Sequence, residues 1–134
     1  MSLTKAANDY AYGGKSRIDL HKAQLNANRQ LNKSNAQYSI DRAAAKRDYK
    51  IAKGKNEARA NKKYDKAVAK SKRAEESANQ AYVNQMYRSN PIVTRTLAKS
   101  GNISVKSLNK ARINAGIDAV DLLVKAGSAY SKRR

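Results

Sequence analysis

The fold is decided between Ser39 and Ala81, where the chain reads SIDRAAAKRDYKIAKGKNEARANKKYDKAVAKSKRAEESANQA. This stretch contains no proline and a single glycine, Gly54. It is dense in Ala, Lys, Arg and Glu, the residues that lose least on entering a helix. The composition therefore predicts helix throughout, and the surplus of Lys and Arg makes that helix basic.

A stripe of small and aromatic residues runs along this predicted helix. Steps of three or four residues from Tyr38 to Tyr82 meet only Tyr, Ala and Ser, apart from Arg42 and Asn56. Small residues let helices approach closely, and tyrosine fills gaps while its hydroxyl stays in water. Stacking of the tyrosines on single-stranded bases is the alternative. The residues expected to pack helices together along this stripe are Tyr38, Tyr49, Ala60, Tyr64, Ala67, Ala74 and Tyr82.

Gly54 leaves two arrangements open. Glycine costs a helix interior about 1 kcal/mol relative to alanine, which is a weak point and not a certain break. An uninterrupted helix from Ser16 to Arg88 would be roughly 110 Å long at ~1.5 Å per residue. The alternative is a bend or hairpin near residues 53–56, in which two shorter helices pack their Tyr and Ala stripes together.

The last third of the chain has clearer helix boundaries. Pro91 after Ser89 and Asn90 predicts the end of the long helix and the start of a short one, Ile92 to Lys99. Ser100-Gly101 is expected to end that helix with a left-handed glycine. Ser104 should then cap a last helix that runs from Val105 to about residue 126. Its expected packing residues are Leu108, Ile117, Val120, Leu123 and Val124.

The predicted fold class is all-α, and the chain is expected to be extended rather than compact. The sequence has no Phe and no Trp, and alanine makes up much of its apolar fraction, so little can fill a core. Three regions are expected: an N-terminal arm (1–14), a long basic helical region (15–89) and a C-terminal helical packing region with a basic tail (90–134).

Charge is the strongest functional signal in the sequence. The formal net charge is +19, and no acidic residue between Ser39 and Ala81 has a base four positions later, the favoured spacing for a helical ion pair. Bases all round a helix suit phosphate contacts and not base readout, although they could simply be a solvated surface. The expected nucleic-acid-binding residues are Lys46, Arg47, Lys50, Lys53, Lys55, Arg59, Lys62, Lys63, Lys66, Lys70, Lys72, Arg73, Lys132, Arg133 and Arg134.

No catalytic residue, metal site or cofactor is expected. His21 is the only histidine and there is no cysteine, so a metal site lacks the usual ligands. Asp118 and Asp121 could do acid–base work, but solubility of one helix face explains them more simply. Gly14-Lys15-Ser16 matches only the end of a phosphate-binding loop, without its first glycine.

Two segments resemble the small internal virion proteins, or ejection proteins, of short-tailed bacteriophages. They are AQLNANRQLNKSNAQYSIDRAAAKRDY (Ala23 to Tyr49) and AGIDAVDLLVKAGSAYSKRR (Ala115 to Arg134). The resemblance implies a helical protein that is carried in the particle near the portal and assembles with copies of itself or with larger companions. This chain is shorter and more basic than that family's pattern, so a membrane-channel role is not expected.

The sequence thus predicts a non-enzymatic structural virion protein. It should self-associate, or associate with larger virion proteins near the portal, and contact nucleic acid, genomic DNA above all, through charge without reading sequence. The alternative is a cellular nucleoid- or ribosome-associated protein, located in the cytoplasm or nucleoid. No small-molecule substrate is expected. Membrane contact is not expected either, since the long helix lacks a Trp, Phe and Leu face that would insert.

Overall fold

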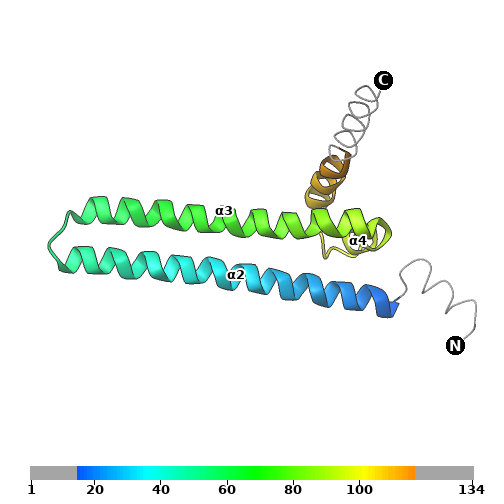
Figure 1. The fold of residues 1–134 in the computed structure, drawn as a ribbon, viewed down its shortest axis with the longest axis horizontal. Coiled ribbons are helices and arrows are strands. Elements are labelled where there is room, and N and C mark those ends of the chain that lie inside the picture. Colours follow the sequence, from blue (N-terminus) through cyan, green and yellow to red (C-terminus); the bar gives the residue numbers. More distant parts are fainter. Residues whose placement is uncertain (1–14, 117–134) are drawn as a thin grey trace, which may run out of the picture. The chain divides into compact units, whose positions relative to one another are not determined.

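Almost every described residue lies in a helix. The computed structural model describes residues 15–116, and this part of the chain contains helices and turns but no strand. α2 spans Lys15–Ala52, α3 spans Glu57–Ser89, α4 spans Pro91–Lys99, and residues 105–116 are also helical (Figure 1). The all-α fold predicted from the sequence is confirmed.

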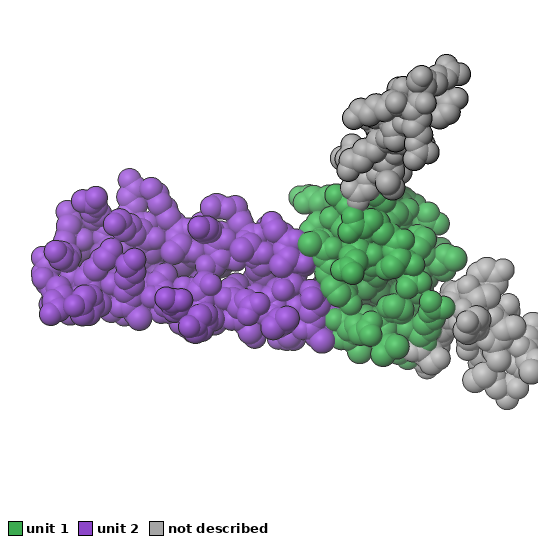
Figure 2. Space-filling view, viewed as in Figure 1, with its two compact units in different colours: residues 1–24, 80–134 green, residues 25–79 purple. Residues whose placement is uncertain are grey.

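The chain divides into two compact units (Figure 2). Residues 25–79 form one of them, which we call the hairpin unit. The described residues 15–24 and 80–116 belong to the other, which we call the core unit. α2 and α3 each contribute residues to both units.

The turn at Gly54 resolves the choice between a continuous helix and a hairpin. Gly54 has a φ of +75°, a left-handed conformation that ends α2. The amide of Gly54 donates to the carbonyl of Ile51 (3.0 Å) and the amide of Lys55 to that of Lys50 (3.0 Å). This is the paired bonding of a Schellman cap. Asn56 then caps α3, because its Oδ1 accepts from the amide of Arg59 (3.2 Å). The chain therefore folds back here, as the second of the two arrangements expected.

The two arms of the hairpin unit meet along a thin and largely polar seam. Its buried apolar side chains are Leu25, Ala36 and Ala60. Asn32 Nδ2 donates both to Asn28 Oδ1 (2.9 Å) and, across the seam, to Asn79 Oδ1 (2.8 Å). Because alanine buries little apolar area, the hydrophobic effect contributes little to the stability of this unit. The hydrogen bonds between asparagine side chains therefore supply a larger share of that stability than they would in an apolar seam.

The α3 side of this seam was predicted correctly in part, and the α2 side was not. Ala60 is buried, Tyr64 and Ala67 are half-buried, and Ala74 is exposed at the seam's edge. Tyr38 and Tyr49 were expected to pack, but each residue is 64% exposed. The half-buried and buried stripe of α2 instead comprises Leu25, Asn28, Asn32, Ala36, Ile40, Ala43, Arg47 and Lys50.

The cause of this error is the turn itself. The predicted stripe steps from Tyr38 forward through Gly54 to Tyr82, as though one helix ran through the turn. Residues 53–56 are not helical, so the helical phase of α3 does not carry over to α2. The inward face of α2 lies about two residues earlier in sequence than the tyrosine stripe, at Ala36 and Ala43 in place of Tyr38 and Ala45.

The core unit holds most of the buried apolar side chains of the described chain. They come from the end of α3, from α4, from the loop after it and from the helical residues 105–116, and they are Val83, Met86, Val93, Leu97, Ile103 and Ala111. Leu108 and Tyr82, both expected to pack, are half-buried in this unit. The other packing residues expected in the last helix, Ile117, Val120, Leu123 and Val124, lie outside the described residues.

The boundaries predicted for α4 and for the start of the following helix are confirmed. Pro91 is the first residue of α4. Gly101 lies just after the cap residue Ser100 at the end of α4 and has a φ of +81°. Ser104 Oγ accepts from the amide of Ser107 (3.1 Å), as a helix cap does. Asn90 occupies the cap position of α4, but its side chain makes no capping bond and accepts instead from Arg17 of α2 (3.3 Å).

Candidate nucleic-acid interface

The basic side chains of the hairpin unit are its dominant surface feature. Residues 25–79 carry fifteen Lys and Arg against six Asp and Glu. All twelve bases predicted within residues 46–73 to bind nucleic acid lie in this unit, and all are exposed except Arg47 and Lys50, which are half-buried. The remaining three, Lys132, Arg133 and Arg134, lie outside the described residues.

Very little of this charge is neutralised within the unit. Among the described residues 25–79, the one ion pair joins Arg47 Nε to Asp48 Oδ1 of the next residue, at 3.1 Å. The Asp48 side chain is two-thirds exposed, so solvent screens that pair. Asp41 Oδ1 accepts a hydrogen bond from the side-chain Nε2 of Gln37 and not from a base. The acids of this unit have no base four residues later, and accordingly no helical ion pair of that spacing forms among the described residues 25–79.

Four bases converge on an open hollow at the turn of the hairpin. The hollow has a volume of about 390 Å³ and is lined by Lys50, Lys55, Asn56, Arg59, Ala60 and Lys63. Lys50 comes from α2, Lys55 from the turn, and Arg59 and Lys63 from α3. No carboxylate lines it. We call this feature the tip hollow.

Like charges face each other across the tip hollow. The nearby charge of Lys63 is the largest cause that lowers the pKa of Lys50 below its ordinary value of 10.5, and partial desolvation and Lys46 add to the effect. Lys50 and Lys63 lie on different arms, so folding of the hairpin is what places these charges together. A bound anion would remove this repulsion.

Tyrosines of the hairpin unit lie beside its cations. The guanidinium carbon of Arg47 is 4.1 Å from the ring centroid of Tyr64, which joins α2 to α3. The two exposed rings have cations beside them from α2 or the turn. The guanidinium carbon of Arg42 lies 5.8 Å from the ring centroid of Tyr38, and Nζ of Lys53 lies 5.5 Å from that of Tyr49. Cations in such positions are attracted to the negative face of the ring.

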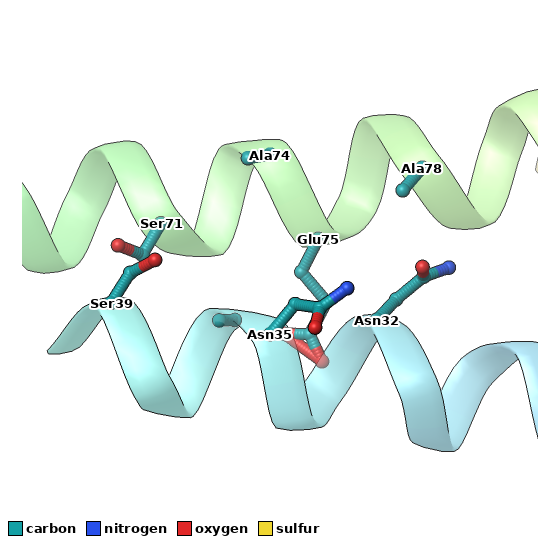
Figure 3. A pocket seen from close by; sticks show the side chains of 8 residues that line it. Asn32, Asn35, Ser39, Ser71, Ala74, Glu75 and Ala78 are labelled. Atoms are coloured by element: carbon teal, nitrogen blue, oxygen red, sulfur yellow. The ribbon is translucent and has the colours of Figure 1, made fainter. Parts of the chain in front are cut away.

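The middle of the seam has a different character. A hollow of about 230 Å³ there is lined by small and polar side chains, with Ser39 and Ser71 pointing toward one another (Figure 3). Glu75 reaches from α3 toward α2 in this hollow, beside Asn35 (Figure 3). The seam is therefore neutral to acidic at its middle and strongly basic at its turn.

A smaller basic group lies in the core unit. Arg95 of α4 donates to the hydroxyl of Tyr87 in α3 (3.4 Å). Hydrogen bonds from Arg95 first, and then from Arg112, lower the pKa of Tyr87 below its ordinary value of 10.0. This group joins three helical segments and had no signal in the sequence, because its members become neighbours only after the core unit folds.

Of the residues that the sequence suggested for catalysis or metal binding, the structure describes His21. Residues 15–116 contain no cluster of three or more His, Asp and Glu side chains able to hold a metal ion. His21 lines a hollow of the core unit with Gln24, Tyr82, Gln85, Met86 and Ser89. Asp118, Asp121 and Gly14 lie outside the described residues. No described helix is long and apolar enough to cross a membrane.

Comparison of this chain with known protein families, with curated proteins and with solved structures finds no match.

Proposed function

We propose that this chain is a non-enzymatic structural protein that binds nucleic acid through the charge of its hairpin unit and does not read sequence. The single observation that supports the proposal is the excess of fifteen bases over six acids in residues 25–79 with one ion pair among them. Phosphate backbones supply matching negative charge, and release of their counterions drives binding.

The distribution of the bases favours contacts with phosphates over contacts with base edges. A helix that reads sequence presents a few side chains on one face to the major groove. Here, basic side chains lie on both arms and on the turn, as at Lys46, Lys55 and Lys70. Contacts of that kind fix position on a duplex but carry no sequence information.

The experiment is a competition assay between duplexes of unrelated sequence. Each unlabelled duplex should displace a labelled one from the protein at the same concentration, because the phosphate backbone is common to all. A duplex that competes much more strongly than its scrambled version would contradict binding without readout.

We assign the protein to the virion on the resemblance of Ala23 to Tyr49 and Ala115 to Arg134 to bacteriophage ejection proteins, with self-association as part of the role. The outward face of α2 supports self-association with a second copy, since Leu31, Tyr38 and Tyr49 follow one another at spacings of a helical stripe and are more than half exposed. Sedimentation that shows only monomer at all concentrations, with and without DNA, would contradict this part.

A cellular nucleoid- or ribosome-associated protein is the second candidate. The basic hairpin unit favours it equally, since phosphate contacts do not depend on whose nucleic acid is bound. The genes beside this one separate the two candidates: capsid and portal genes support the virion role, and ribosomal or replication genes support the cellular one.

A further inference from the structure

We propose that the tip hollow is a discrete phosphate site, which holds one phosphate group of a nucleic-acid backbone between the two arms of the hairpin. This inference rests on the proposed function for the identity of the polyanion. It goes further in assigning the strongest contact to one place, so that the hairpin binds by its turn and not evenly along its length.

The geometry of the tip hollow suits an anion with several oxygens. Lys50, Lys55, Arg59 and Lys63 line it from three segments of the chain, and no carboxylate competes for them. A phosphate has several acceptor oxygens, and bases that approach it from different directions can each donate to a different one. Bases farther along α3, such as Lys70 and Lys72, are exposed and do not line this hollow.

The electrostatics of the free protein point to the same place. Lys63 opposes protonation of Lys50 and lowers its pKa, so folding holds two like charges near each other. An anion in the hollow would stabilise both charged forms. Binding should therefore gain more here than at an isolated surface lysine.

The backbone around the tip hollow is held in place by its own hydrogen bonds. The cap at Gly54 fixes the end of α2, and the bond from the Arg59 amide to Asn56 Oδ1 fixes the start of α3. The bases therefore project from positions that are set before a ligand arrives, which lowers the entropic cost of binding. The middle of the seam offers no such site, because Glu75 reaches into the hollow there.

Two double variants with the same change in charge test the inference. Lys50→Ala with Lys63→Ala removes two bases of the tip hollow, and Lys70→Ala with Lys72→Ala removes two exposed bases elsewhere in the hairpin unit. Affinity for a short labelled DNA duplex is measured by fluorescence anisotropy over a range of salt. Circular dichroism confirms that both variants stay helical, and Lys50→Arg with Lys63→Arg checks that charge at these positions is what matters.

The expected result is an unequal loss. The tip variant should lose at least about tenfold in affinity and about one unit of the salt slope, because one phosphate contact is lost, whereas the control variant should lose less than about threefold in affinity. The arginine variant should keep most of the affinity. Equal losses in the tip and control variants would overturn the discrete site and leave the proposed function standing. If the unchanged protein does not bind the duplex, both fall.

Two further probes identify the source of the phosphate. Tripolyphosphate should displace the duplex only at much higher concentration, because it offers no neighbouring backbone to the other bases. Vesicles of phosphatidylglycerol should bind less tightly than the duplex, and the tip variant should not change that binding. If tripolyphosphate or the vesicles bind as tightly as the duplex and the tip variant abolishes this binding, the assignment to a nucleic-acid backbone is overturned.

Discussion

The guanidinium group of Arg47 lies over the ring of Tyr64, 4.1 Å from the ring centroid, and so joins the two arms of the hairpin unit. Arg47 was predicted to bind nucleic acid and Tyr64 to pack between helices. The structure brings them together, so this arginine has a structural contact within the protein as well as a place on the basic surface.

Replacement of Tyr64 should weaken the hairpin unit. A cation on an aromatic face contributes about 0.5–2 kcal/mol, so Tyr64→Leu should lower the free energy of unfolding by about 1 kcal/mol in urea titrations. Tyr49→Leu is the matched control, since that residue is 64% exposed, and its effect should stay within about 0.5 kcal/mol. Equal effects of the two changes would show that the contact with Arg47 contributes no more than the exposed contact of Tyr49 with Lys53.

The turn should depend on glycine at position 54. Gly54 has a φ of +75°, and a Cβ there would meet no atom within 4 Å, so the cost of a side chain is conformational and not steric crowding. Gly54→Ala should therefore cost about 1–2 kcal/mol, and Gly54→Asn less, because asparagine tolerates this conformation. The control is Gly116→Ala in the helical residues 105–116, which should stabilise the protein by about 0.5–1 kcal/mol. Thermal unfolding of the three variants measures these differences. A Gly54→Ala protein as stable as the original would contradict the described turn.

The core unit should be the part most sensitive to loss of apolar volume. Leu97 in α4 is fully buried, so Leu97→Ala should cost about 2–5 kcal/mol of unfolding free energy. Ile113 is 64% exposed, and Ile113→Ala should change stability by no more than about 0.5 kcal/mol. Chemical denaturation followed by circular dichroism gives both values, and a mild effect of Leu97→Ala would contradict the described core.

The pKa of Lys50 should rise when its neighbour loses its charge. Lys63 is the largest cause of the lowered pKa, so Lys63→Gln should bring the pKa of Lys50 back toward 10.5 in an NMR titration of the lysine side chains. In the unchanged protein the unfolded chain binds the Lys50 proton more tightly than the folded one does. Stability should therefore rise as pH increases through the interval just below 10.5, and this contribution should shrink in the variant. A pKa of Lys50 that does not respond to Lys63→Gln would contradict the described proximity of the two residues.

Local signals in the sequence were sufficient for the boundaries of α4 and for the start of the helical residues 105–116. Pro91, Gly101 and Ser104 each act through their own backbone or side chain, so their positions predicted where α4 and the helical residues 105–116 begin or end. Gly54 marked the position of the turn for the same reason, but the hairpin was the alternative to a continuous helix and not the first interpretation.

The inward face of α2 could not be predicted in this way. Spacing defines a face only within one helix, and residues 53–56 break the helical phase between α3 and α2. The two candidate stripes of α2 also differ little in hydrophobicity: Tyr38 and Tyr49 lie on the exposed stripe, while Asn32, Arg47 and Lys50 lie on the one facing α3. The tip hollow was missed for a related reason, because Lys50 and Lys63 face each other only once the hairpin has formed.

The salt dependence of DNA binding tests the central claim most directly. If the bases of the hairpin unit act by neutralising backbone phosphates, the logarithm of the binding constant should fall linearly and steeply with the logarithm of the salt concentration, by about 0.9 for each phosphate contacted. The slope should be the same for duplexes of unrelated sequence. Affinity that stays constant as salt is raised would contradict the claim.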